Sequence, residues 1–91
     1  MEELLELLKE SGYYVNINES TLKLFSDNRH LMTLTLSNYL MSVVPGPGYG
    51  HMKKIELPMR LSFNELIDEI HNYEKGLFID YDSNGFEYLM F

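Results

Sequence analysis

Oxygen-bearing side chains gather in residues 80–85, which read Asp-Tyr-Asp-Ser-Asn-Gly. This run matches the first half of a calcium-binding loop, in which oxygen ligands alternate before a glycine turn. The twelfth position, where a calcium loop needs a bidentate glutamate, is Phe91. A hairpin turn at residues 83–85 explains the same residues, because Asn-Gly favours tight turns between strands. We therefore expect a turn here, with no metal and no other cofactor.

Three histidines, His30, His51 and His71, are the other side chains able to hold a metal or move a proton. Their spacing does not resemble that of metal ligands on one helix. No Gly-x-Ser-x-Gly elbow is present for a nucleophilic serine, and the chain has no cysteine. The sequence thus predicts a protein that is not an enzyme. The competing interpretation is a small metal-dependent module built on Asp80, Asp82 and a histidine.

The glycine-rich stretch at residues 45–50 reads Pro-Gly-Pro-Gly-Tyr-Gly. It lacks the Lys-Ser/Thr ending with which a P-loop binds phosphate, and it leads toward a strand where a P-loop leads into a helix. Proline cannot donate to a strand ladder, so the stretch is expected to be a loop.

Composition sets limits on the class of protein. The 91 residues include 14 acidic and 7 basic side chains, for a formal charge of −7, and 45% of the residues are hydrophobic. We expect one globular domain over residues 1–91, because this length and apolar content suit a single core. The negative charge disfavours direct nucleic-acid binding, and no apolar run is long enough to cross a bilayer. The absence of cysteine and of a signal-like start favours the cytoplasm.

The spacing of apolar residues predicts a helix and then a β-meander. Leucines recur at helical spacing within residues 2–11, and Gly12 is placed to end that helix. From Tyr13 the period changes to two, with a bend or bulge at Glu19 and Ser20. The expected strands cover residues 13–17, 22–24, 32–36, 39–44 and 54–57.

A second helix is marked by a capping box, Ser62 with Glu65, flanked by apolar residues spaced as a hydrophobic staple. Its expected buried stripe consists of Phe63, Leu66, Ile67, Ile70 and Tyr73. Gly76 is expected to end it, before a C-terminal hairpin of strands 77–79 and 86–91. The last strand is apolar on both faces, which fits either ordinary core or a methionine-containing pocket for a partner's side chain. The predicted fold is α+β, an antiparallel sheet of about five strands with two helices on one face.

Two segments, residues 9–12 (Lys-Glu-Ser-Gly) and 17–24 (Ile-Asn-Glu-Ser-Thr-Leu-Lys-Leu), resemble the phage uracil-DNA glycosylase inhibitor family, as does the gap between them. Residues 77–79 and 82–85 are similar to that family's final hairpin, and the chain has a similar size and acidity. In that family an edge strand enters the DNA groove of the glycosylase, and an apolar pocket takes the leucine that the enzyme inserts when it flips a base. A decoy of this kind substitutes carboxylates for phosphates.

The resemblance implies that residues 18–22 form the edge strand, with Glu19 as the leading contact and Ser20 beside it at the phosphate-binding amides of the enzyme. The implied partner-binding strand consists of Asn18, Glu19, Ser20, Thr21 and Leu22. Predicted inward-facing apolar residues proposed to line the pocket are Leu24, Met32, Leu34, Met41 and Ile67.

The predicted function is therefore a DNA-mimicking inhibitor of uracil-DNA glycosylase, expected to be a monomer that forms a one-to-one complex with the enzyme. The alternative within the same class is a phage anti-CRISPR protein that occludes the DNA-recognition cleft of a CRISPR effector. Both interpretations use the acidity of the chain, and they differ in the target.

Overall fold

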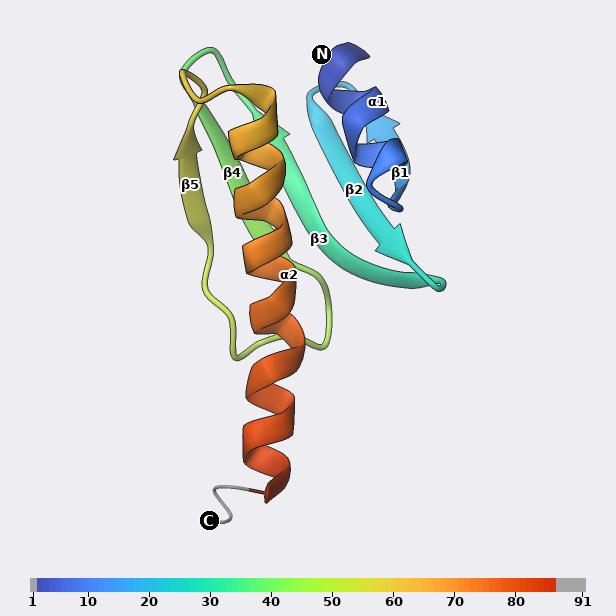
Figure 1. Cartoon of the computed structure of the whole chain (residues 1–91), viewed down its shortest axis with the longest axis vertical. Coiled ribbons are helices and arrows are strands. Elements are labelled where there is room, and N and C mark those ends of the chain that lie inside the picture. Colours follow the sequence, from blue (N-terminus) through green and yellow to red (C-terminus); the bar gives the residue numbers. More distant parts are fainter. Residues whose placement is uncertain (1, 87–91) are drawn as a thin grey trace.

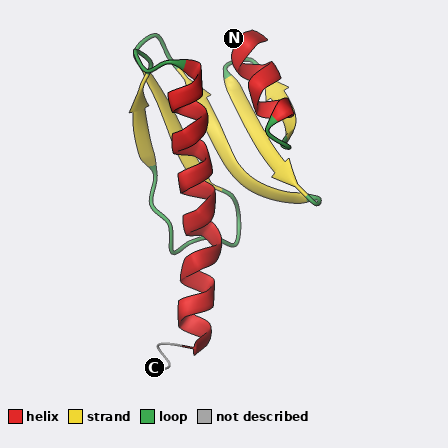
Figure 2. Cartoon of the chain, viewed as in Figure 1, coloured by secondary structure: helices red, strands yellow, loops and turns green. Residues whose placement is uncertain are grey.

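The computed structural model describes residues 2–86, and describes side chains as far as Phe78. Within this range five antiparallel strands form one sheet, and two helices pack on it (Figures 1 and 2). The elements are α1 (Glu2–Glu10), β1 (Tyr14–Asn18), β2 (Thr21–Ser26), β3 (Arg29–Leu36), β4 (Leu40–Pro45), β5 (Ile55–Pro58) and α2 (Phe63–Phe86). This arrangement confirms the predicted α+β fold. No helix within the described residues is long and apolar enough to cross a membrane.

The sheet is a meander in which each strand pairs with the next, in the order β1-β2-β3-β4-β5. A two-residue turn joins β1 to β2, so Ile17 lies opposite Leu22 and Val15 opposite Leu24. Pairing across a turn of two residues places odd positions opposite even ones. This explains why the apolar residues change parity at the predicted bend.

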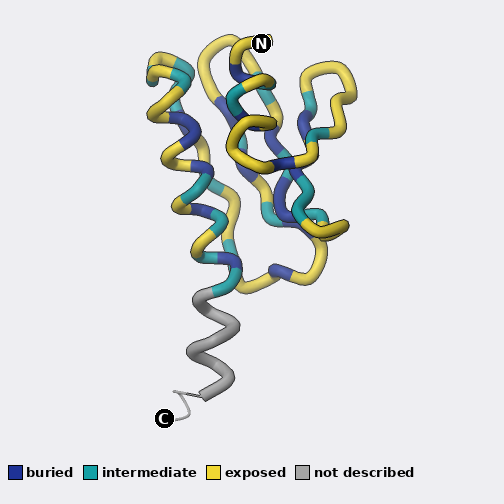
Figure 3. The backbone as a smooth tube through the Cα atoms, turned by 45° about the vertical axis from the view of Figure 1, so that its right-hand side comes forward, coloured by how far each residue is buried: buried dark blue, intermediate teal, exposed yellow. Residues whose placement is uncertain are grey.

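The core lies between one face of the sheet and the two helices (Figure 3). Its fully buried side chains come from both helices and from the inward face of three strands. They are Leu4, Leu8, Leu22, Leu24, Leu31, Met32, Leu34, Met41, Val43, Leu66, Ile70 and Leu77. The opposite face of the sheet carries exposed residues on successive strands, among them Lys23, Thr35, Val44 and Glu56. The two helices thus cover one face of the sheet and leave the other open.

α1 ends as its sequence predicts. Gly12 has a φ of +102°, its N–H donates to the carbonyl of Lys9, and the N–H of Tyr13 donates to the carbonyl of Leu8 at 3.2 Å. This pair of bonds is the Schellman motif, in which a left-handed residue that favours glycine closes the helix. The motif turns the chain directly into β1.

α2 begins at the predicted capping box. The backbone N–H of Ser62 donates to Oε1 of Glu65 at 2.9 Å, and the N–H of Glu65 donates to Oγ of Ser62 at 3.2 Å. These bonds satisfy two N–H groups that the first turn of a helix leaves without partners. Of the expected buried stripe, Phe63 is half-buried and the other four residues are buried.

The predicted end of α2 at Gly76 is wrong, and so is the hairpin that was to follow it. α2 continues to Phe86, so residues 77–79 are not a strand. The backbone of residues 80–85 is helical, which is not the loop that a hairpin turn or a calcium site requires. Leu77 is fully buried one helical turn beyond Tyr73, so it extends the buried stripe at helical spacing. The rest of the predicted last strand, residues 87–91, lies outside the described residues.

Gly76 does not end α2 but allows close packing against it. A Cβ at this position would lie 2.7 Å from Cε of Met52. The carbonyl of Gly76 also accepts a hydrogen bond from Nε2 of His51 at 3.2 Å. Glycine here lets the loop after β4 lie directly against α2, and this tertiary contact offsets its low helix propensity.

Tyr13 links the two helices. Its hydroxyl donates to Oε1 of Glu74 at 2.5 Å, and its ring lies 5.7 Å from that of His71. Burial, the hydrogen bond to Glu74 and the charge of that carboxylate all raise the pKa of Tyr13 far above its usual 10.0. Burial also raises the pKa of Tyr73, whose hydroxyl donates to the carbonyl of Lys53 at 2.6 Å.

These phenols predict a loss of stability in alkali. Above about pH 10, the ordinary pKa of tyrosine, the unfolded chain releases protons that Tyr13 and Tyr73 still hold in the folded protein, because their pKa values are raised. The stability is therefore fully present below about pH 10 and falls as the pH rises further. We expect Tyr13→Phe to lower the free energy of unfolding at neutral pH by about 1–3 kcal/mol, because Glu74 loses its donor. The variant should also lose less stability between about pH 9 and pH 11. Urea unfolding across this range tests both effects, and parallel curves for the two proteins would contradict the assignment.

Candidate functional site

The segment expected to form a single edge strand is a hairpin turn. Asn18 ends β1, Glu19 and Ser20 form the turn, and Thr21 and Leu22 begin β2. The prediction of one strand over residues 18–22 is therefore wrong. The alternation of apolar residues changes parity here because the chain reverses direction at residues 19 and 20.

Glu19 nevertheless occupies an unusual position. It is exposed, and its φ is +57°, in the left-handed region that favours glycine or asparagine. The turn is anchored because the carbonyl of Ser20 accepts a hydrogen bond from the N–H of Leu36 at 2.9 Å. A glutamate is a poor choice for this backbone, so the fold does not explain its presence. Residues held in such conformations cluster at functional sites.

The strain at Glu19 can be measured. We expect Glu19→Ala to change the free energy of unfolding by less than about 0.5 kcal/mol, because alanine meets the same backbone cost and the lost side chain is exposed. Glu19→Gly should raise it by roughly 0.5 kcal/mol, since relief of the left-handed conformation slightly exceeds the entropy cost of glycine. Urea denaturation of both variants tests this. A loss of several kcal/mol in Glu19→Ala would instead make the carboxylate a structural element.

The six apolar residues assigned to the partner site all belong to the core. Five have no exposed surface, and Ile67 is 7% exposed. These residues are Leu22, Leu24, Met32, Leu34, Met41 and Ile67. The structure therefore brings them together, but beneath the helices, where a side chain from another protein would have to separate the helices from the sheet to reach them. Hollows on the described surface are lined by other residues.

Negative charge is concentrated on the helices. Residues 2–10 of α1 and 63–78 of α2 together include eight acidic residues and two lysines, which leaves six uncompensated negative charges. We call the eight residues the acidic helical layer. They are Glu2, Glu3, Glu6, Glu10, Glu65, Asp68, Glu69 and Glu74. All but Glu74 are exposed. Apart from Glu74, which accepts a hydrogen bond from the buried Tyr13, the layer faces away from the sheet, since the opposite stripe of each helix is buried (Figure 3).

Residues 11–62, which form the sheet and its connecting loops, have a net charge of the opposite sign. Residues 11–62 contain five basic and three acidic residues, which leaves two uncompensated positive charges. They are Lys23, Arg29, Lys53, Lys54 and Arg60 against Glu19, Asp27 and Glu56. The two parts, with net charges of −6 and +2, account for −4 of the total charge of −7, and the other three negative charges belong to Asp80, Asp82 and Glu87.

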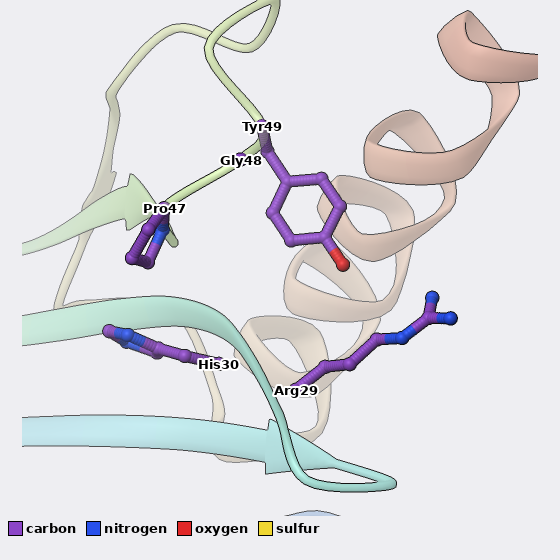
Figure 4. A pocket seen from close by; sticks show the side chains of 5 residues that line it. All are labelled: Arg29, His30, Pro47, Gly48 and Tyr49. Carbon is purple, nitrogen blue, oxygen red and sulfur yellow. The ribbon is translucent and has the colours of Figure 1, made fainter.

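A hollow of about 450 Å³ lies between the start of β3 and the glycine-rich loop. Figure 4 shows Arg29 and His30 on the strand, with Pro47, Gly48 and Tyr49 on the loop above them. The His30 ring is oriented by a 2.9 Å hydrogen bond between its Nε2 and Oγ1 of Thr33. The five lining residues include no carboxylate, so the hollow lacks the paired acid and base that hydrolytic chemistry uses.

The metal-dependent interpretation rests on Asp80 and Asp82, whose side chains lie outside those that the structure describes. Among the residues that the structure describes, no three His, Cys, Asp or Glu side chains are placed to hold a metal ion. The three histidines lie on different elements. His30 on β3 bonds to Thr33, His51 in a loop bonds to the carbonyl of Gly76, and the ring of His71 on α2 packs near that of Tyr13.

The acidic helical layer is a candidate binding surface that the sequence analysis did not predict. The glutamates of α1 form the polar face of an amphipathic helix, and such a face is ordinarily exposed to solvent without a binding role. The sequence does contain one indication of such a surface, because both helices carry acidic residues on their polar faces. Only the packing of α1 and α2 on the same face of the sheet places the two polar faces on one side of the molecule (Figure 1).

Comparison of the chain with models of known protein families, with curated proteins and with solved structures finds no match.

Proposed function

We propose that this protein is a DNA-mimicking inhibitor that occupies the DNA-binding surface of uracil-DNA glycosylase through its acidic helical layer. The observation that carries the proposal is the division of charge, with a net charge of −6 on residues 2–10 and 63–78 of the helices and of +2 on the sheet and loops of residues 11–62. A DNA-binding surface attracts phosphates through lysine and arginine, and regularly spaced carboxylates compete for the same groups. The glycosylase is chosen as the target on the sequence resemblance.

The exposed carboxylate of Glu19 extends this anionic surface. The chain runs down α1, up β1 and down β2, so the turn that carries Glu19 lies at the same end of the molecule as the first turn of α1 (Figure 1). Glu2 and Glu3 occupy that first turn. The strain at Glu19 fits a residue retained for a contact with a partner, and both Glu19→Ala and Glu19→Gly should weaken inhibition.

The proposal does not include capture of a leucine side chain by an apolar pocket. The residues assigned to that pocket are sealed in the core, and opening it would expose apolar surface at about 25 cal/mol per Å². Affinity on this proposal comes from charge-assisted hydrogen bonds and from electrostatic attraction during encounter.

The test is a titration of uracil excision. A bacterial uracil-DNA glycosylase at fixed concentration acts on a labelled uracil-containing duplex while this protein is added. Loss of activity near a one-to-one ratio is expected. Inhibition that requires a large excess and equals that of an unrelated protein of the same charge would indicate general charge competition and contradict the proposal. Full activity at a large excess excludes the glycosylase as target, and the same titration against a CRISPR effector then tests the alternative.

A further inference from the structure

The two edges of the sheet differ in their protection against pairing with another strand. β5 carries Glu56 and ends at Pro58, and Lys54 forms an ion pair with Glu56 at 3.7 Å. Charges and proline are the features with which natural edge strands block further pairing. β1 reads Tyr-Val-Asn-Ile-Asn and contains neither, and within the described residues β2 is its only strand neighbour (Figure 1). β1 is thus an open edge.

The hairpin register shows which backbone groups face outward along β1. Across the two-residue turn Asn18 pairs with Thr21, the position at which a hairpin of this length forms its first hydrogen-bonded pair. Bonded and non-bonded pairs alternate along an antiparallel ladder. Asn16 therefore directs its N–H and C=O toward β2. Val15 and Ile17 direct theirs toward solvent, where another strand can pair with them.

Burial on the helix-covered face falls off at this same edge. Ile17, Leu22, Leu34 and Val43 lie opposite one another across four strands. The last three have no exposed surface, whereas Ile17 is 47% exposed. On this face the side chains of β2 are therefore more completely covered than Ile17 of β1. An apolar side chain thus remains accessible next to backbone groups that no other described strand pairs with.

We propose that β1 pairs with β1 of a second copy of this chain, antiparallel and about a two-fold axis through Asn16. The sequence of β1 is self-complementary in this register, because Val15 of one copy lies opposite Ile17 of the other and the two Asn16 residues lie opposite each other. The outward N–H and C=O groups of Val15 and Ile17 then pair across the axis. Each exposed Ile17 gains an apolar neighbour, and the two sheets become continuous.

Charge gives this dimer a distinctive salt dependence. Each copy carries a formal charge of −7, so repulsion opposes association at low ionic strength. The dimer should strengthen as salt is added, whereas a complex with a cationic partner should weaken. The proposal is independent of the proposed function, and it differs from the monomer expected on the sequence alone.

A disulfide across the axis tests the register directly. The chain has no cysteine, so Asn16→Cys introduces a single thiol. In the proposed register the two Cα atoms form a non-hydrogen-bonded pair about 4.5 Å apart, within the range of about 4.4–6.8 Å that disulfides span. Thr35→Cys is the matched control, because Thr35 is exposed on the same open face but lies on an interior strand. Under mild oxidation at high salt, Asn16→Cys should form the covalent dimer at least about tenfold faster, since association raises the local thiol concentration.

Sedimentation equilibrium of the unmodified chain supplies the second measurement. A concentration-dependent dimer that strengthens with salt is expected, and Ile17→Lys should remove it by placing a charge at the open edge. Val44→Lys, on an exposed position of β4, should leave it unchanged. Equal oxidation rates for the two cysteine variants, a monomer at every salt concentration, or a dimer that survives Ile17→Lys would each overturn the proposal.

Discussion

Neutralising part of the acidic helical layer is expected to remove most of the inhibition while the fold is retained. The variant combines Glu6→Gln, Glu10→Gln, Asp68→Asn and Glu69→Gln. All four side chains are exposed, and the set avoids Glu65 and Glu74, which bond to Ser62 and Tyr13. Charge acts mainly on encounter, so the association rate with the glycosylase should fall by roughly 10- to 100-fold at low salt. Each change should cost less than about 0.5 kcal/mol of stability.

The matched control neutralises the other side of the molecule. Lys23→Gln with Arg29→Gln removes two exposed positive charges from the sheet side and leaves the acidic helical layer intact. Its association rate should stay at or above that of the unmodified chain. Association rates measured at two salt concentrations test both variants, because the dependence on salt should flatten only when the helical carboxylates are removed. Equal losses in the two variants would show that the helices are not the binding surface.

Gly46→Ala is expected to be among the most destabilising single changes in the chain. A Cβ at this position would lie 2.0 Å from the carbonyl oxygen of His30 and 3.1 Å from that of Leu31, so backbone must move to admit it. The movement would also disturb the 2.8 Å hydrogen bond from the N–H of Gly46 to the carbonyl of Leu31. We expect a loss of about 3 kcal/mol, at the upper end for overpacking, and a fall in melting temperature of more than about 10 °C.

Two nearby glycines provide controls for that prediction. Gly50→Ala meets nothing within 4 Å, so it should leave the free energy of unfolding within about 0.5 kcal/mol of its original value. Gly48→Ala also meets open space, but its φ of +96° disfavours alanine, and a loss of about 1–2 kcal/mol is expected. Thermal and urea unfolding should show the largest loss of stability for Gly46→Ala, a smaller one for Gly48→Ala and the smallest for Gly50→Ala. A Gly46→Ala protein as stable as Gly50→Ala would contradict the close approach between the loop and β3.

The elements with local signals were predictable from the sequence. Gly12 closes α1 through bonds to residues only a few positions away, and Ser62 and Glu65 cap α2 through each other. The alternation of apolar residues predicts the meander, because each strand must bury one face. These features depend on residues close together in the chain, so the local sequence is sufficient to predict them.

The end of α2 and the partner site were settled by contacts between distant residues. Gly76 looks like a helix terminator, but Met52 and His51 pack against it from a loop some 25 positions earlier, and the helix continues. The apolar residues assigned to a pocket are core, because α1 and α2 both cover them. Hydropathy marks a residue as apolar and does not show what covers it.

The sequence by itself determined the α+β class, the two helix starts, the meander and the total charge, since these follow from local hydrogen bonding, periodicity and composition. The tertiary structure decided which surface carries that charge and which strand edge stays open. Both depend on how α1 and α2 sit on the sheet. Their placement on one face brings the carboxylates of two helices far apart in the sequence to one side of the molecule, and Ile17 at the edge of β1 stays 47% exposed.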